Sequence, residues 1–349
     1  NRITRRNTKG FNVIPNKYLT YRSRSDSNFF HFNQNNIGKT GLVSKYYPVF
    51  TSKDGIEANQ FFVFLLNYHS SILSRQGVGT SQVVLSYVAL KNIKLPIPPL
   101  PEQKKIAKIL SGIDFEILLI KNKKERYYQL LKAISIEIFQ KLRQSFPPRK
   151  LQNACSLITK GATPTTYGYS LSNTRFSDSI TFLGGGSTSE SGVFDLKPAR
   201  YCQDKAVSIL KRSQLSKGDS LVTIVGASIG NTCQIPSYVL PANINQNVAL
   251  IRADQSLLSS DFVNLFLRTL GRQALIDIAT TQAQPSVSLK QVGELQIPIP
   301  DIEHQIKINN TVKSINSFID ALEKKIKKKE LLKNAISCDL LSGRKRVNA

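Results

Sequence analysis

The sequence predicts an α+β protein with two mixed α/β domains, each built on a curved, mostly antiparallel sheet, and two long helices that form a coiled coil. Three observations carry this prediction. The chain repeats itself internally, each copy ends in a long stretch of helical apolar periodicity, and short β-branched runs precede those stretches. A length of 349 residues is enough for about two domains.

The internal repeat is the strongest signal in the chain. A displacement of 202 residues superimposes Leu95–Gln103 on Ile297–Gln305 without a gap, and it gives 15 identities across residues 82–142. The upstream parts match more loosely, and there we align Ile37–Thr40 with Ile229–Thr232. Because a period this long exceeds that of any solenoid repeat, we interpret it as a duplicated module with pseudo-twofold symmetry.

Both copies of the module are predicted to end in a helix. Pro101 and Pro300 lie near the two helix starts, where proline is tolerated. Apolar residues then recur at three- and four-residue spacing, which marks one helical face. Residues 102–144 as one helix would be about 65 Å long. Each helix has one apolar stripe, so we expect the two to bury these stripes against each other or against a partner. The residues predicted at this interface are Ile106, Ile113, Ile117, Leu130, Ile134, Ile308, Ile315, Ile319, Leu332 and Ile336.

The parts before the helices are predicted to be mixed domains. β-branched runs at Ser220–Val225, Gly226–Gly230 and Asn247–Arg252 are bounded by Gly, Pro and Asn, and are typical of strands. Residues 259–277 are predicted to form a helix. The expected boundaries are a first domain over 1–95, a central helix over 96–146, a second domain over 147–296 and a distal helix over 297–349. The shorter first domain suggests that it is incomplete at its N-terminus.

Composition restricts the class of protein. The longest clean apolar run, Phe61–Leu66, is far shorter than the roughly 18 residues of a spanning helix. The four cysteines and three histidines have no spacing suited to a zinc site or a disulfide framework, so we expect a cytoplasmic protein without a metal site. The net charge of +25 indicates a polyanionic partner. Nucleic acid is favoured over the alternative, an anionic membrane surface.

Three partial enzyme motifs fail on inspection. Gly38–Thr40 resembles the end of a P-loop, but the required earlier glycine is Asn33. Phe182–Gly186 resembles a methyl-donor loop but lacks a strong βαβ context. Pro300–Gln305 resembles a nuclease carboxylate cluster, but its copy at Pro98–Gln103 has no aspartate. We therefore predict no catalytic residue, and the binding of nucleic acid remains.

Polar, turn-forming runs supply candidate contacts to DNA. Asn and Gln can bind adenine edges through two hydrogen bonds, whereas Ser, Thr and Lys can contact bases or phosphates. The same residue types also cap turns, which is the alternative at each position. The candidates are Lys39, Thr40, Ser81, Gln82, Lys160, Thr163, Thr165, Ser228, Asn231, Asn245, Gln246, Gln282, Gln284 and Ser286.

The repeated motif resembles a known family. Leu95–Gln103 and its copy Ile297–Gln305, together with Ser156–Thr165, Val222–Asn231 and Leu340–Val347, are similar to the specificity subunits of type I restriction–modification systems. The resemblance covers essentially the whole chain. It implies two target recognition domains joined by a pair of antiparallel helices, and each domain would read one half of a split, asymmetric sequence in double-stranded DNA.

The resemblance also implies partners. Two methyltransferase subunits would dock on the chain, and restriction translocase subunits would join them for cleavage. S-adenosylmethionine, Mg²⁺ and ATP would then be bound only by those partners, and this chain would be a non-catalytic subunit without a cofactor. Three alternatives remain open: the specificity chain of a fused, type II-like modification system, a self-contained methyltransferase or nuclease, and a coiled-coil nucleic-acid scaffold.

Overall fold

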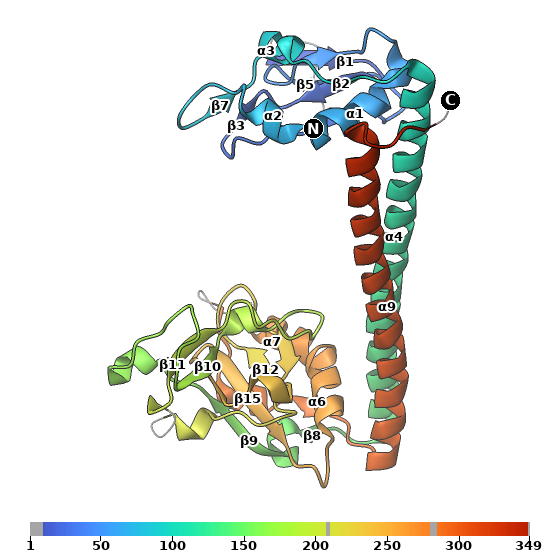
Figure 1. Cartoon of the computed structure of the whole chain (residues 1–349). Helices are drawn as coiled ribbons and strands as arrows, with labels where there is room; N and C mark the ends of the chain where they lie inside the picture. Colours follow the sequence, from blue (N-terminus) through green and yellow to red (C-terminus); the bar gives the residue numbers. More distant parts are fainter. Residues whose placement is uncertain (1–9, 207–209, 280–284, 348–349) are drawn as a thin grey trace. The chain divides into compact units, whose positions relative to one another are not determined.

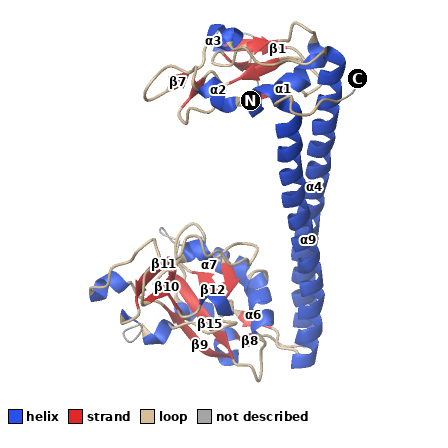
Figure 2. Ribbon diagram, in the orientation of Figure 1, coloured by secondary structure: helices blue, strands red, loops and turns tan. Residues whose placement is uncertain are grey.

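The structure is a computed structural model that describes residues 10–206, 210–279 and 285–347. The chain divides into two compact units. Unit 1 holds residues 1–124 and 321–349, and unit 2 holds residues 125–320. Each unit contains its own small sheets and a part of each of two long helices, α4 and α9, as Figures 1 and 2 show.

Unit 1 begins with small strands followed by short helices. Its strands are β1 (Phe11–Ile14), β2 (Leu19–Tyr21), β3 (Arg24–Ser25), β4 (Phe32–Gln34), β5 (Gly41–Ser44), β6 (Val49–Phe50) and β7 (Val83–Val84). Its short helices are α1 (Asn59–Tyr68), α2 (Ser70–Ser74) and α3 (Tyr87–Asn92). The strands form the antiparallel sheet β4-β2-β6 and the pairs β1-β5 and β3-β7.

Unit 2 is larger. Its strands are β8 (Arg149–Lys150), β9 (Cys155–Lys160), β10 (Ser179–Leu183), β11 (Arg200–Gln203), β12 (Ser220–Thr223), β13 (Thr232–Gln234), β14 (Ala242–Ile244), β15 (Val248–Ala253) and β16 (Gln296–Ile297). Its short helices are α6 (Ser260–Leu267), α7 (Leu270–Ala279) and α8 (Leu289–Gly293). The main sheet has the order β13-β12-β15-β9 and is antiparallel throughout, while β10 pairs with β11 antiparallel and with β14 parallel.

The long helices are α4 (Leu100–Ser145) and α9 (Ile302–Leu341). They run antiparallel, because early residues of α4 pair with late residues of α9. Lys333 contacts Asp114 at 2.6 Å, and Lys124 contacts Glu323 at 2.5 Å. Each apolar stripe packs inward, so the prediction of two long packed helices is confirmed. Of the ten apolar residues predicted at their interface, Ile106 and Ile117 are buried, six are half-buried, and only Leu130 and Leu332 are exposed.

The two units share one topology, which explains the sequence repeat. In unit 1 the central strand β2 pairs with β4 and β6, and in unit 2 the central strand β12 pairs with β13 and β15. The helix α1 follows β6 as α6 follows β15. Further along, Ser86 caps α3 and Ser288 caps α8 in the same way. In each, the serine hydroxyl oxygen accepts a hydrogen bond from the backbone N–H three residues later. The duplication therefore extends through the sheets, where sequence identity alone is weak.

Each unit buries its own core against the long helices. In unit 1, Phe61 and Leu65 of α1 pack against Ile106 and Leu110 of α4 and Leu341 of α9. In unit 2, the ring of Phe139 in α4 lies 5.0 Å from that of Phe262 and 5.5 Å from that of Phe266, both in α6. The helices are thus part of each folded unit rather than an appendage to it.

Two local expectations were wrong. The helix predicted over 259–277 is broken into α6 and α7 at Arg268 and Thr269, where the backbone N–H of Thr269 donates to the carbonyl of Phe266 at 3.1 Å, three residues earlier rather than four. The strand predicted at Gly226–Gly230 is a turn, since both of its glycines adopt positive φ angles, +95° and +81°. That turn matters below, because it carries two of the predicted DNA contacts.

Candidate nucleic-acid interface

Four antiparallel strands of unit 2 bring several loops to one edge of the main sheet. Thr223 at the end of β12 lies opposite Val248 at the start of β15, and Lys160 at the end of β9 lies opposite Ala249. The loops that follow β9, β12 and β14 therefore meet at the same edge. We call this the loop edge of unit 2.

Most predicted contacts of the second domain lie on this loop edge. The hydroxyl of Thr163 donates a hydrogen bond to Oε1 of Gln246 at 2.5 Å, which joins the loop after β9 to the loop before β15. The backbone of Asn245 donates to the carbonyl of Leu183 at 3.0 Å, which adds the end of β10. Residues far apart in sequence thus form one polar surface. Lys160, Thr165 and Gln246 are exposed on it.

The turn after β12 presents two further candidates. The backbone of Asn231 donates to the carbonyl of Ser228 at 3.0 Å, and Gly230 and Thr223 bond to close the turn. Within the described part of the chain, the side chains of Ser228 and Asn231 have no hydrogen-bond partner, and both are half-exposed. A polar side chain that is partly exposed and unpartnered is free to bond to a ligand.

Not every candidate has its side chain free. Oδ1 of Asn245 accepts a bond from the backbone of Asn247 at 3.0 Å, so this residue shapes a turn. Ser286 forms a bridge with Val225, beside the same turn. Gln282 and Gln284 lie outside the described residues. The structure therefore separates candidates whose side chains shape a turn from candidates whose side chains are available to a ligand. Sequence spacing alone does not reveal this distinction.

A close backbone approach fixes the loop after β9. A Cβ atom on Gly161 would overlap the carbonyl oxygen of Ile244 in the next sheet. On the other side of the edge, a Cβ on Gly185 would lie 3.2 Å from Oγ1 of Thr223. These glycines let the two sheets meet, and a larger side chain at either position would push the loops apart.

The candidates in unit 1 fall into two groups. Ser81 and Gln82 precede β7, and Nε2 of Gln82 donates to Oδ1 of Asp26 at 3.1 Å, close to the end of β2. Lys39 and Thr40 lie instead just before β5, and Nδ2 of Asn35 binds the Lys39 carbonyl at 2.9 Å. All except the half-buried Gln82 are exposed among these four candidates. They do not form one surface.

The shared topology shows which group matches the loop edge of unit 2. The start of β4 corresponds to the start of β13, and the end of β2 to the end of β12. The pairing of Arg24 with Val84 likewise corresponds to the bridge between Val225 and Ser286. The equivalent edge of unit 1 therefore lies at residues 22–31, 45–47 and 77–82, and Ser81 and Gln82 belong to it.

Our alignment of Ile37–Thr40 with Ile229–Thr232 was therefore wrong. Ile229–Thr232 leads into β13, whereas Ile37–Thr40 follows β4, the counterpart of β13, and leads into β5. The short local similarity had outweighed the strand order. Sequence reasoning also missed Arg22, Arg24, Phe29 and His31, which lie on the equivalent edge of unit 1. The dense Arg and aromatic content of residues 22–31 was the signal that could have found them.

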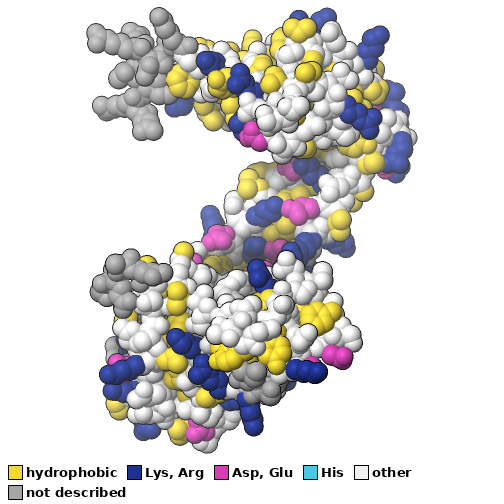
Figure 3. Space-filling view, turned by 90° about the vertical axis from the view of Figure 1, so that its left-hand side faces the viewer, with side chains coloured by type: hydrophobic (Ala, Val, Ile, Leu, Met, Phe, Trp, Pro, Cys, Tyr) yellow, Lys and Arg dark blue, Asp and Glu magenta, His cyan; other side chains and the backbone are white. Residues whose placement is uncertain are grey.

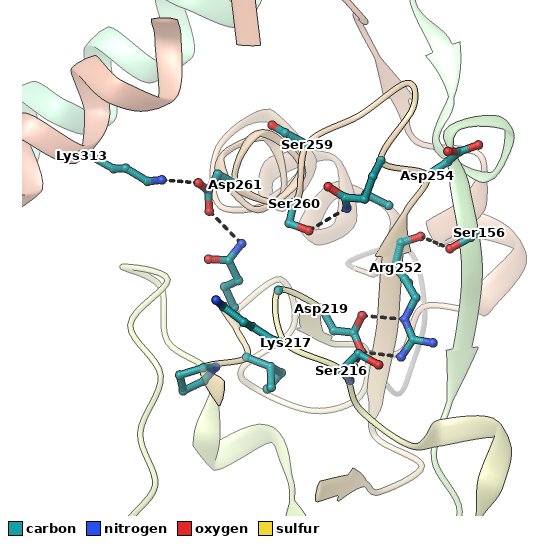
Figure 4. Close-up of a pocket in the computed structure, with 16 residues that line it drawn as sticks. Ser156, Ser216, Lys217, Asp219, Arg252, Asp254, Ser259, Ser260, Asp261 and Lys313 are labelled. Atoms are coloured by element: carbon teal, nitrogen blue, oxygen red, sulfur yellow. Dashed lines mark hydrogen bonds and ion pairs between the residues drawn. The ribbon is translucent and has the colours of Figure 1, made fainter. Parts of the chain in front are cut away.

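The opposite edge of the unit 2 sheet has a different chemistry. A pocket of about 880 Å³ lies there, and Figure 4 shows two ion pairs among its charged side chains, Arg252 with Asp219 and Lys313 with Asp261. Nε of Arg252 donates to Oδ1 of the buried Asp219 at 2.8 Å, and this bond raises the pKa of Arg252. Burial would raise the pKa of Asp261, but its bonds to Lys313 and Gln234 hold that pKa below the usual value. Four of the charged side chains that line the pocket are thus paired with one another, as is typical of structural support rather than of a reactive centre.

Other chemistry is not assembled in the described residues. Among them, no group of three or more His, Cys, Asp or Glu side chains is placed to hold a metal ion. Burial and the nearby Asp254 raise the pKa of the Cys155 thiol to about 12, which keeps it protonated and unreactive. No described helix is both long and apolar enough to cross a membrane. Lys and Arg side chains are spread over the face in Figure 3 and outnumber Asp and Glu there.

Comparison with known proteins decides the family. A family model described as the type I restriction modification DNA specificity domain matches residues 3–126 and 168–332. The chain belongs to this family. The two matched stretches correspond to the two copies of the internal repeat, and in this specificity-domain protein each copy carries a loop edge.

Relatives of known name are similar over much of the chain. The type I restriction enzyme EcoBI specificity subunit of Escherichia coli is 25% identical over 287 residues, which cover 74% of this chain and 60% of that subunit. The MjaVIII specificity subunit of Methanocaldococcus jannaschii is 25% identical over 331 residues, which cover 89% of this chain and 76% of that one. The chain thus spans about three fifths of the E. coli relative.

Solved structures agree on the fold of this specificity-domain protein. The crystal structure of a type I restriction-modification system S subunit from M. genitalium has a TM-score of 0.53 at 15% identity, covering 95% of this chain and 84% of that one. A chain from a study of complex assembly and conformational transition of the type I system has a TM-score of 0.56 at 16% identity, with coverage of 96% and 84%. The α+β fold with two domains and long helices is therefore confirmed.

Proposed function

We propose that this chain is the DNA-reading subunit of a type I restriction–modification complex, and that its two units each read one half of a split, asymmetric target. The observation that carries the proposal is the pair of equivalent loop edges. Each is built on the same three-stranded core, β4-β2-β6 or β13-β12-β15. Because the two loop edges differ in sequence, they would read different half-sites.

The proposed subunit has no catalytic role of its own. The loop edges carry amide, hydroxyl and cationic side chains, which suit base edges and phosphates. Enzymes that modify a base must take it out of the stack, and we assign that step to methyltransferase partners. S-adenosylmethionine, Mg²⁺ and ATP would then be bound by partner subunits.

Exposed apolar side chains on the long helices support docking of methyltransferase subunits. On α4 of unit 1, Phe115 is 60% exposed, Leu118 53% and Leu119 50%. On α9, Leu331 is 70% exposed. Gly112, one turn before Phe115, has open space around its Cβ position, so a partner helix could approach closely there. Exposed apolar side chains clustered on one surface mark interaction sites. Restriction subunits would join through the docked complex.

The test uses the chain together with its co-expressed methyltransferase subunit. The complex is incubated with S-adenosylmethionine and a randomised duplex pool, and methylated positions are sequenced. A two-part motif with an unread gap is expected. Methylation without sequence preference contradicts the proposal, and a palindromic gapped motif would mean that two chains each contribute one reader. Methylation by the purified chain alone would contradict its non-catalytic role.

Two variants of unit 2 sharpen this test. Asn231→Ala should relax one base position of the motif, because the lost side chain is a candidate base contact. Lys160→Ala should weaken binding of DNA about equally for all sequences, because lysine is a candidate phosphate contact. It should also reduce the salt slope, the steepness with which log affinity falls with log salt concentration, by about one. The exposed Lys141 on α4 is the matched control for Lys160, since its Nζ is bound to Glu137 at 2.6 Å.

A further inference from the structure

A pocket opens on the loop edge of unit 1, at the end of β2. Its volume is about 420 Å³. It is lined by cationic, aromatic and amide side chains together with one carboxylate: Arg22, Arg24, Ser25, Asp26, Ser27, Phe29, His31, Asn33 and Tyr47. The pocket occupies the place in unit 1 that the turn with Ser228 and Asn231 occupies in unit 2.

Arg24 is the lining residue best prepared to donate. Its guanidinium lies 4.3 Å from the ring centroid of Tyr46, a cation–π contact that fixes the side chain and leaves the N–H edge exposed. The backbone of Tyr46 is held beside Ser23, because its carbonyl accepts bonds from the backbone and the hydroxyl of Ser23 at 2.9 and 2.8 Å, and Nζ of Lys45 also lies 5.4 Å from the Tyr46 ring centroid. In the described part of the chain, the Arg24 side chain makes no hydrogen bond or ion pair.

The neighbouring arginine is engaged differently. Nη2 of Arg22 lies 3.8 Å from Oδ2 of Asp26, whose Oδ1 accepts the bond from Gln82. Phe29 is 51% exposed, and its ring stacks on that of His31 at 6.4 Å. The pocket therefore contains Arg24, whose N–H donors are free, Asp26, whose carboxylate is contacted by its neighbours, and the exposed ring of Phe29.

The carboxylate of Asp26 favours a base over a phosphate as the ligand of this pocket. A phosphate beside Arg24 would also face the Asp26 carboxylate, which is 67% exposed and repels it. A G·C pair suits both groups, because arginine donates twice to guanine O6 and N7 while a carboxylate accepts from the cytosine amino group. The combination of donor and acceptor is matched by a base-pair edge in the major groove.

We propose that Arg24, held over Tyr46, reads a guanine in the half-site of unit 1, and that Tyr46 is its positioning residue. This inference rests on the proposed function and assigns a reading residue within it. It also locates the reading edge of unit 1 at the end of β2 rather than at Lys39 and Thr40, which lie at the start of β5.

The experiment repeats the methylation of the randomised duplex pool with Arg24→Ala in the full complex. One guanine of one half-site should lose its preference by about ten- to a hundredfold, the range of one bidentate contact. The other half-site should remain strictly required, which shows in the same reaction that the variant is folded and assembled. Lys53→Ala removes the same charge in the exposed loop after β6, at the opposite edge of the sheet, and it should leave every position unchanged.

Tyr46 supplies the second arm. Tyr46→Leu should weaken the preference for the same guanine, and Tyr46→Phe should retain it because the ring remains. If Arg24→Ala instead weakened binding by the same factor for all DNA sequences, with a lower salt slope, the inference would be overturned in favour of a phosphate contact. An unchanged motif in Arg24→Ala would also overturn the inference about Arg24. The proposed function would still stand, provided that the wild-type complex shows a split motif. A wild-type complex without a two-part motif overturns both.

Discussion

Gln103 and Gln305 make the same hydrogen bond in the two copies of the repeated motif. Nε2 of each donates to the carbonyl oxygen of the proline five residues earlier, at 2.9 Å to Pro98 and at 2.8 Å to Pro300. Both glutamines are buried. The bond closes the proline-rich joint that leads into each long helix, which gives a physical reason for the repeated glutamine.

The contacts of Gln305 predict a large effect of its removal. Its Oε1 also accepts a bond from the backbone of Ser259, and its Nε2 donates to the carbonyl of Leu257. Gln305→Leu would leave the buried Pro300 carbonyl and two partly buried backbone groups unpaired, and we expect a loss of about 3 kcal/mol in the free energy of unfolding. Denaturant unfolding measures this, with the exposed Gln140→Leu as control. An equal effect of both variants would contradict the assigned role.

The pairing of Glu102 with Arg346 predicts a dependence on pH. Nε of Arg346 donates to Oε1 of Glu102 at 2.9 Å, and this interaction holds the pKa of Glu102 below its ordinary value of 4.5. The folded chain therefore binds this proton less readily than the unfolded chain. The resulting stability is present above pH 4.5 and is lost as the pH falls through the lowered pKa.

The variant Glu102→Gln should lower the thermal midpoint at neutral pH, and the difference from wild type should shrink on acidification. Thermal unfolding across a pH series measures it. Glu303→Gln is the matched control, because Glu303 occupies the first turn of α9 as Glu102 occupies that of α4, but its side chain is exposed and pairs only with Lys307. A constant difference at every pH would rule out the carboxylate as the cause.

Gly161 predicts a steric effect at the loop edge of unit 2. Gly161→Ala places a methyl group onto the Ile244 carbonyl, so the sheets must separate. We expect a loss of about 3 kcal/mol in unfolding free energy and loss of preference for one half-site. Gly112→Ala has open space in the middle of α4 and should stabilise the chain by about 1 kcal/mol. Denaturant unfolding measures both changes in the free energy of unfolding, which should have opposite signs. Changes of the same sign would contradict the steric argument.

The exposed apolar face of α4 predicts selective loss of a partner. Leu119→Glu should reduce binding of the methyltransferase subunit at least about tenfold, because a charge would be buried in the proposed interface. The fold should not change, since Leu119 is 50% exposed. Ile37→Glu is the matched control, an exposed isoleucine in the loop before β5. Co-purification measures binding, and an equal reduction by both variants would argue against docking on α4.

Local signals predicted the long helices and two of the three strands expected in unit 2, whereas Gly226–Gly230 forms a turn. Apolar spacing placed α4 within two residues at its start, and β12 and β15 lie where β-branched runs indicated them. The break between α6 and α7 was missed, because apolar spacing does not reveal the shifted backbone hydrogen bond between Thr269 and Phe266.

The candidate site was predicted less evenly. In unit 2, seven candidates lie in or next to loops that meet at one edge: Lys160, Thr163, Thr165, Ser228, Asn231, Asn245 and Gln246. In unit 1, Lys39 and Thr40 were chosen as part of a polar, turn-forming run, whereas the equivalent edge is defined by strand order. Strand pairing joins residues such as Arg24 and Val84, which lie 60 positions apart. Such non-local pairings carry no signature in a single sequence.

The strand β15 begins beside a loop of the proposed reading surface and ends beside a paired, buried charge. Near its start lies Gln246, and near its end Arg252 binds Asp219. Changes at one end would alter what is recognised, while changes at the other would alter whether unit 2 folds. New specificities could therefore accumulate with little loss of stability, since the proposed reading positions and the supporting ones are separated along six residues of backbone.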